Sequence, residues 1–166
     1  MIIRKRLTME DSNKNILLEV LTEIFEEFAF VFLEEESDDG APPDDDALLA
    51  EIGFSSSRRS GKLILAASRS LCSEVAENVL GEEDQENLPW NASRNALQEL
   101  VNIACGNILA RLYGTKENFE LSVPSCLEIS AEQWRRRLGG EGAIFLSAEG
   151  EPIGARLTLD KGKRNI

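Results

Sequence analysis

Residues 91–113 read NASRNALQELVNIACGNILARLY, and this stretch decides the fold. Its apolar side chains recur at steps of three and four residues, which is typical of a helix that packs on one side. Gly114 supplies a stop signal directly after it. The stretch therefore predicts a long helix from Asn91 to Tyr113. The predicted packed side holds Leu97, Leu100, Val101, Ala104, Ile108, Arg111 and Leu112.

Two further helices and several strands are predicted around this helix. One helix covers residues 13–33 with Ser12 as its N-cap, and the other covers residues 69–80 and ends at Gly81. Helices beside hairpin-linked strands favour an α+β fold, a two-layer sandwich with a mostly antiparallel sheet and the long helices packed on one face. Strands are predicted at residues 48–54, 62–67, 119–123, 126–129, 143–148 and 153–159, with Pro124 interrupting the middle pair.

Chain length and one acidic segment set the domain organisation. A chain of 166 residues fits one domain, so residues 1–166 are predicted to form a single unit. Residues 34–46 read EEESDDGAPPDDD, and such like charges and paired prolines predict a loop in solvent. Their spacing does not match the calcium-binding loop of an EF-hand.

The composition excludes several kinds of chemistry. The chain has no histidine, which removes Ser-His-Asp and Cys-His nucleophiles, histidine metal sites and histidine phosphotransfer. Cys72, Cys105 and Cys126 are widely spaced, so we expect reduced, mostly buried thiols. Trp90 and Trp134 are expected to pack in the core or at helix ends.

Charge and hydropathy indicate where the protein works. The net charge of −12 opposes binding to nucleic acid. No apolar run reaches the roughly 18 residues that span a bilayer. We therefore expect a soluble, cytoplasmic protein that binds neither nucleic acid nor membrane.

One stripe of the long helix gathers polar residues. At about 100° per residue, Asn95, Glu99, Asn102 and Gly106 fall close together, opposite the apolar side. On its own this stripe is an ordinary solvated face. A glycine inside a helix costs roughly 0.5 to 1 kcal/mol relative to alanine, so Gly106 indicates close approach of another backbone, either of a partner or of a neighbouring element.

These residues resemble a known family. Residues 99–107, ELVNIACGN, followed by Ser122-Val123-Pro124-Ser125, are similar to the E-x-x-N-x-x-x-G-N helix and downstream proline of the CheC/CheX/FliY phosphatases. The family pattern has Asp or Ser four residues before the glutamate, and proline after 22 intervening residues. Here Asn95 holds the upstream place, and Pro124 follows Asn102 after 21 residues.

The resemblance implies a function and a role for each residue. It implies a phosphatase acting on the phosphoaspartate of a CheY-like response regulator, with Asn102 orienting the attacking water. It implies that Glu99 pairs with a lysine of the regulator, and that Asn95 and Gly106 lie against this partner. The resemblance implies no cofactor of the protein's own, because the bound regulator supplies Mg²⁺. It also implies a homodimer.

The helix predicted at residues 69–80 bears on the number of sites. CheC- and FliY-type members carry two functional helices, and the CheX type carries one. Glu74 and Glu77 stand where glutamate and asparagine would be needed, and Asn78 comes one residue late. The chain is therefore similar to a single-site, CheX-like member.

Three alternatives remain open at this point. A catalytically inactive module with the same fold could bind a receiver domain or serve as an adaptor, as the changes at Asn95 and Pro124 suggest. A dimerising scaffold could use the acidic loop 34–46 as its contact surface. A lysine-dependent hydrolase has the least support, because Lys14, Lys62 and Lys116 lie in no recognisable motif.

Overall fold

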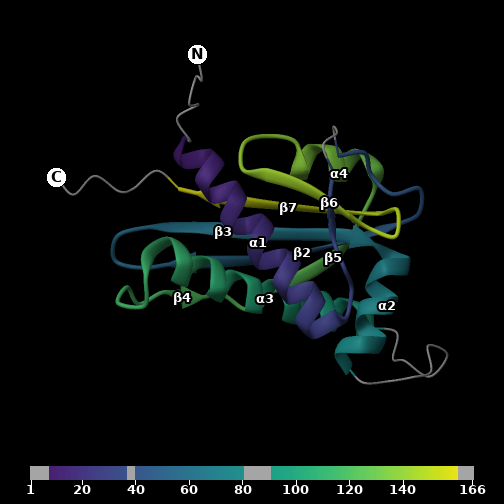
Figure 1. Cartoon of the computed structure of the whole chain (residues 1–166), viewed down its shortest axis with the longest axis horizontal. Helices are drawn as coiled ribbons and strands as arrows, with labels where there is room; N and C mark the ends of the chain where they lie inside the picture. The colour runs from purple at the N-terminus through teal and green to yellow at the C-terminus, as the bar shows by residue number, and fades with distance from the viewer. Residues whose placement is uncertain (1–7, 37–39, 81–90, 161–166) are drawn as a thin grey trace, which may run out of the picture.

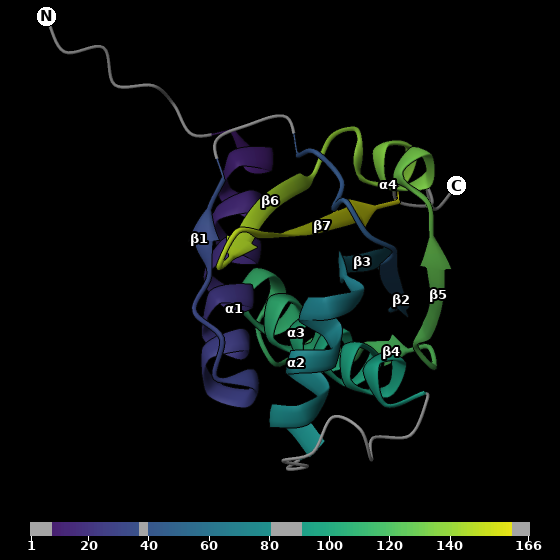
Figure 2. The ribbon, with the colours of Figure 1, turned by 90° about the vertical axis from the view of Figure 1, so that its right-hand side faces the viewer.

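The computed structural model describes residues 8–36, 40–80 and 91–160. Within this part of the chain a seven-stranded antiparallel sheet has the order β1-β6-β7-β3-β2-β4, and β5 also pairs with β2. Three helices cover one face of the sheet, and a fourth packs on the other face (Figures 1 and 2). The elements are α1 (Met9–Ala29), β1 (Glu34–Glu35), β2 (Ala47–Ser55), β3 (Ser60–Ser68), α2 (Arg69–Leu80), α3 (Ala92–Tyr113), β4 (Glu120–Leu121), β5 (Ser125–Ile129), α4 (Ala131–Leu138), β6 (Ala143–Ala148) and β7 (Glu151–Leu159). The predicted α+β fold is confirmed.

Two hairpins form the body of the sheet, as predicted. β2 and β3 pair along their whole length, from Ala47 opposite Ser68 to Ser55 opposite Ser60. β6 and β7 meet at a tight turn, where Glu149 and Gly150 both have positive φ, at 51° and 84°. This is the backbone geometry that two-residue hairpin loops require, and glycine adopts it without strain.

The first helix begins earlier and ends sooner than predicted. Its N-cap is Thr8, not Ser12, because Thr8 and Asp11 form a reciprocal capping box that satisfies two backbone N–H groups. It ends at Ala29, since Phe30 takes the left-handed conformation with φ 55° and ψ 33°. The prediction to residue 33 followed the apolar residues past this break.

The second face of the sheet carries α4, which was not predicted. Ser130 caps this helix, and Trp134 and Leu138 are fully buried against the sheet. The Trp134 Nε1–H donates a hydrogen bond to the Gly40 carbonyl at 3.0 Å. The predicted packing of Trp134 is confirmed, whereas Trp90 lies outside the described residues.

The acidic segment is not entirely a loop. Glu34 and Glu35 form β1, which pairs with Ser147 and Leu146 of β6 at the edge of the sheet. A pair of glutamates has little strand propensity, so this short pairing depends on the neighbouring hairpin. Residues 37–39 of the segment lie outside the described part.

The state of the cysteines and the polarity of the helices agree with what the composition predicts. Cys72, Cys105 and Cys126 are free thiols; the first two are buried and the third is half-buried, as expected. Among the described residues, no helix is long and apolar enough to cross a bilayer.

Candidate functional site

Helix α3 buries the side that its sequence predicts. Leu97, Val101, Ala104 and Ile108 are almost completely buried against α1, α2 and the sheet. Ala92 is the first helical residue, one later than predicted, and Gly114 ends the helix with a φ of 75°. The opposite side of α3 therefore faces away from the core.

The four candidate residues lie along this outer side. Asn95, Glu99 and Gly106 are exposed, and Asn102 is half-buried. A Cβ atom built on Gly106 meets no atom within 4 Å. Of the two explanations for this glycine, approach of a neighbouring element therefore has no support in the described chain, and approach of a partner remains.

The functional groups on this side are free to bind something else. Among the described residues, Glu99 has no ion pair and no side-chain hydrogen bond, and neither has the carboxamide of Asn102. A free carboxylate can pair with a cation, and a free carboxamide can both donate and accept hydrogen bonds. The outer side of α3 thus presents a charge and a bifunctional polar group to a partner.

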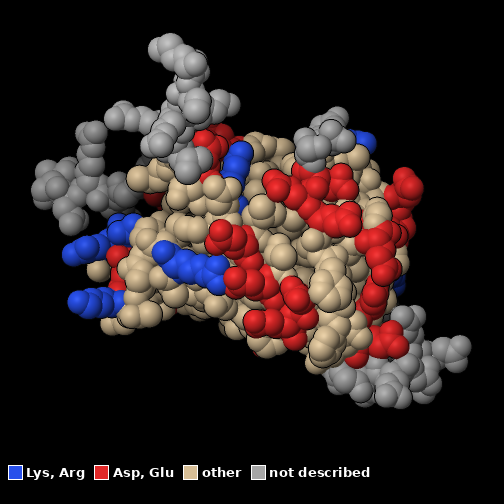
Figure 3. All heavy atoms as spheres, in the orientation of Figure 1, with Lys and Arg blue, Asp and Glu red and all other residues tan. Residues whose placement is uncertain are grey.

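The helix layer as a whole is acidic. Figure 3 shows carboxylates gathered on the face where α1 lies in front of the sheet. Arg111 of α3 pairs with Glu19 at 3.5 Å and with Glu23. Glu26 and Glu27 on α1 are also exposed. Such a face favours the approach of a positively charged surface.

A loop from the sheet edge reaches α3 at Gln98, one turn before Asn102. The Gln98 Nε2–H donates a hydrogen bond to the Pro124 carbonyl at 2.9 Å. On the other side of this loop, Ser122 and Gly53 exchange two hydrogen bonds of 2.8 Å. No local sequence pattern predicts these contacts, because they join residues 26 and 69 positions apart.

A match to a protein-family model shows which family the chain belongs to. The model described as chemotaxis phosphatase CheX matches residues 48–147, which include α3 and Pro124. The chain belongs to the CheX family. No curated protein matches its sequence significantly.

Solved structures share the CheX fold at low sequence identity. CheX from Vibrio vulnificus superposes with a TM-score of 0.68 at 14% identity, covering 92% of this chain and 99% of the other. CheX from Desulfovibrio desulfuricans gives 0.67 at 14%, covering 90% and 99%. A CheX–CheY–BeF₃–Mg²⁺ complex from Borrelia burgdorferi gives 0.59 at 16%, covering 94% and 100%.

The second core helix of this CheX member has a structural task. On α2, the Asn78 Nδ2–H donates to the Ala29 carbonyl at 2.6 Å, close to the end of α1. Helix ends leave carbonyl groups without partners, so this bond stabilises the junction of α1 and α2. The carboxamide of α2 is therefore occupied, in contrast to that of Asn102.

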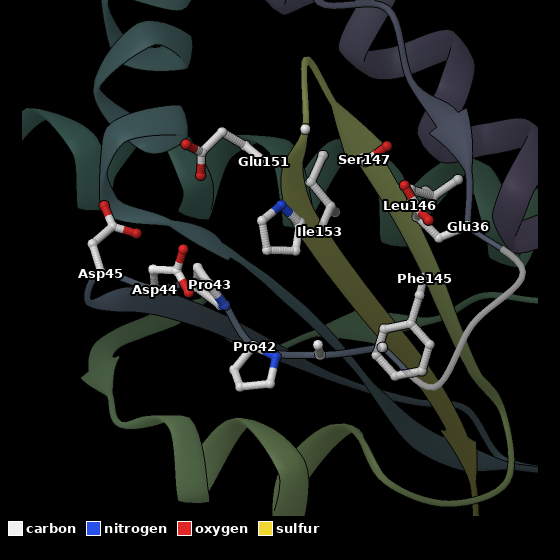
Figure 4. Close-up of a pocket in the computed structure, with 14 residues that line it drawn as sticks. Glu36, Pro42, Pro43, Asp44, Asp45, Phe145, Leu146, Ser147, Glu151 and Ile153 are labelled. Carbon is white, nitrogen blue, oxygen red and sulfur yellow. The ribbon is translucent and has the colours of Figure 1, made fainter.

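A cavity of about 610 Å³ lies away from α3 (Figure 4). Its walls come from the segment around Pro42 and Pro43 and from β6 and β7, including Phe145 and Ile153. No residue of α3 lines it. The stripe of candidate residues on α3 therefore lies apart from this cavity, and α3 remains the candidate site.

Proposed function

We propose that this protein hydrolyses the phosphoaspartate of a CheY-like response regulator through the outer side of α3. One observation carries the proposal: the exposed side of the helix in the matched region holds Glu99 and Asn102, and neither side chain has a partner in the described chain. The structure from Borrelia burgdorferi, in which CheX is bound to CheY with BeF₃ and Mg²⁺, supports a partner of this kind.

The proposed chemistry depends on positioning. The carboxamide oxygen of Asn102 accepts a hydrogen bond from a water molecule, which aligns the water oxygen for in-line attack on phosphorus. The water oxygen bonds to phosphorus as the P–O bond to the aspartyl carboxylate breaks, and both protons of the water leave with inorganic phosphate as H₂PO₄⁻. The regulator's carboxylate leaves with the bonding electron pair.

The other residues hold the regulator in register. The Glu99 carboxylate accepts a charge-assisted hydrogen bond from a lysine of the regulator. Asn95 lies one turn before Glu99, and Gly106 lies one turn after Asn102, so both border the contact. The regulator brings its own Mg²⁺, which neutralises charge on the phosphoryl oxygens.

The decisive experiment follows the decay of acyl phosphate on CheY-like receiver domains with Mg²⁺ present. Wild-type protein is expected to accelerate the decay, and Asn102→Ala to abolish the acceleration while binding persists. Asn15→Ala is the matched control, since Asn15 is an exposed asparagine on α1. This control is expected to keep wild-type activity.

One result would favour the alternative function. If the wild-type protein binds activated receiver domains and leaves their decay unchanged, the protein is an inactive receiver-binding or dimerising adaptor. Loss of activity in Asn15→Ala as well as Asn102→Ala would instead point to a general effect on folding.

We also propose that the protein works as a homodimer that pairs through its sheets. β5 pairs with β2 at one edge of the sheet. Leu127 of β5 is 40% exposed, so an apolar side chain is accessible at this edge. Sedimentation equilibrium should give twice the chain mass of 18.4 kDa. A single species of the chain mass at micromolar concentration would contradict the dimer.

A further inference from the structure

Helix α3 and residues 119–126 run beside each other in opposite directions. Tyr113, the last residue of the helix, stacks near Phe119 with ring centroids 5.7 Å apart. About four turns earlier in the helix, Gln98 donates a hydrogen bond to the Pro124 carbonyl. Residues of α3 also contact β5, and Figure 2 shows β4 beside the helix.

Gln98 belongs to one row of the helix together with Arg94 and Asn102, since the three residues are spaced four positions apart. Burial raises the pKa of the Cys126 thiol to about 11, and the positive charge of Arg94 acts in the opposite direction.

Four helical residues advance by about 6 Å, and two extended residues by about 6.6 Å, so the two steps match. Because helix and segment run in opposite directions and Gln98 bonds to Pro124, Asn102 falls level with residues 122–123. The Val123 side chain is 90% exposed, so the main chain of this segment is what can face the helix. The half-buried state of Asn102 on an otherwise exposed stripe agrees with such a neighbour.

Two anchors hold this neighbouring segment in place. Gln98 fixes it to α3 through the Pro124 carbonyl, which can only accept, so the amide NH₂ of Gln98 must face it. Ser122 fixes it to β2, since its N–H donates to the Gly53 carbonyl and its Oγ accepts from the Gly53 N–H. The segment is thus held to two different layers within three residues.

We propose that Gln98, together with Ser122, is a positioning residue for the phosphatase reaction. The two anchors hold residues 122–124 as a wall that restricts the carboxamide of Asn102 to one orientation. That carboxamide has no hydrogen-bond partner of its own in the described chain, and in this proposal contact with the main chain of residues 122–124 sets its direction. This inference rests on the proposed function.

The kinetic test compares two substitutions of Gln98. Gln98→Met keeps the length and removes the donor, and we expect kcat to fall about tenfold with the KM for phosphorylated regulator unchanged, because Glu99 still docks it. Gln98→Lys restores a donor of similar reach and should recover most of kcat. Ser122→Ala removes the side-chain half of the other anchor and keeps its backbone hydrogen bond, so it should lower kcat by a smaller factor.

Hydrogen exchange tests independently of enzyme activity whether Gln98 holds residues 122–124 in place. Hydrogen exchange of the Ser122, Val123 and Ser125 amides should speed up in Gln98→Met, while the β2–β3 amides keep their protection. Thr8→Ala is the control for general destabilisation, since it removes the capping box of α1, far along the chain. It should leave both kcat and the exchange of this segment unchanged.

The outcomes separate this inference from the proposed function. If wild-type protein is active, Asn102→Ala is inactive and Gln98→Met keeps wild-type kcat, the positioning role is wrong and the function stands. A KM effect without a kcat effect would overturn it too, because the wall would then contact the regulator. If wild-type protein has no activity, both proposals fail, and the exchange data then report only on packing.

Discussion

The proposed role of Glu99 rests on its lack of an ion-pair partner among the described residues. Its carboxylate is exposed and has no cationic partner among the described residues, although α3 carries Arg94 and Arg111 on other sides. A carboxylate reserved in this way can pair with a lysine of an incoming domain. Because the surrounding helix layer is acidic, such a pair would be reinforced by longer-range attraction.

Replacing Glu99 should therefore weaken docking and spare chemistry. We expect Glu99→Ala to raise the Kd for activated regulator about tenfold, the cost of roughly 1.4 kcal/mol for a lost interfacial charge pair. Titration calorimetry with a stably activated receiver domain would measure it. Glu132→Ala removes an exposed carboxylate from α4 on the other face and serves as control. An unchanged Kd in Glu99→Ala would remove the role assigned to Glu99.

At the scale of elements, α3 accepts a costly residue on its exposed side. Gly106 lies mid-helix, and the open space around it means that no packing in the described chain demands a glycine. Glycine at this position therefore lowers the stability of α3 at the point where the backbone of a partner could come closest. Stability and docking should respond in opposite directions to substitution here.

Gly106→Ala should make the protein more stable and bind its regulator less well. Alanine loses less backbone entropy on folding, so the free energy of unfolding should rise by about 0.5 to 1 kcal/mol in urea titrations. The bulkier Gly106→Gln should retain part of this gain and reduce regulator affinity further. If Gly106→Gln binds as tightly as wild type, the glycine does not face the partner.

Elements with a strong apolar period were predictable, and short elements were not. α3 and the two long hairpins follow from periodicity and turn residues, because burial in the core selects those patterns directly. α4 offers only Trp134 and Leu138 as apolar anchors among arginines, so its burial depends on the sheet beneath it. The pairing of β1 depends likewise on β6 being present.

The candidate site was predictable only in part for a similar reason. The stripe of Asn95, Glu99, Asn102 and Gly106 follows from helical geometry, and the structure places these residues on one exposed side. The anchors Gln98 and Ser122 depend on how the sheet edge folds back over the helix. No local pattern carries that information, since tertiary contacts alone create it.

At the scale of the whole molecule, the thiols report on folding. Burial raises the pKa of Cys105 from 9.0 to about 12, and raises that of Cys72 further. The folded state therefore holds these protons more tightly than the unfolded state does. This contribution to stability is complete below about pH 9 and is lost as the pH rises toward 12.

The reactivity of the cysteine thiols and the stability of the fold should depend on pH in the same range. At pH 8 the native protein should react with iodoacetamide far more slowly than the urea-unfolded chain, because the thiolate is the nucleophile. The free energy of unfolding should decline between pH 9 and pH 12, and Cys105→Ala should decline less steeply. Rapid alkylation of Cys105 in the native protein, mapped by mass spectrometry, would contradict its burial.

The bond from Gln98 to the Pro124 carbonyl also changes how relatives of this chain should be recognised. The position of the proline is set by a contact in space, so a residue gained or lost in the turn at residues 114–118, outside the Glu117–Arg59 ion pair of 3.0 Å, would leave the two anchored ends in place. The spacing of 21 residues after Asn102 can therefore drift in homologues without moving the proline. A motif search that fixes this spacing will miss such members, whereas one that requires a hydrogen-bond donor one turn before the asparagine will recover them.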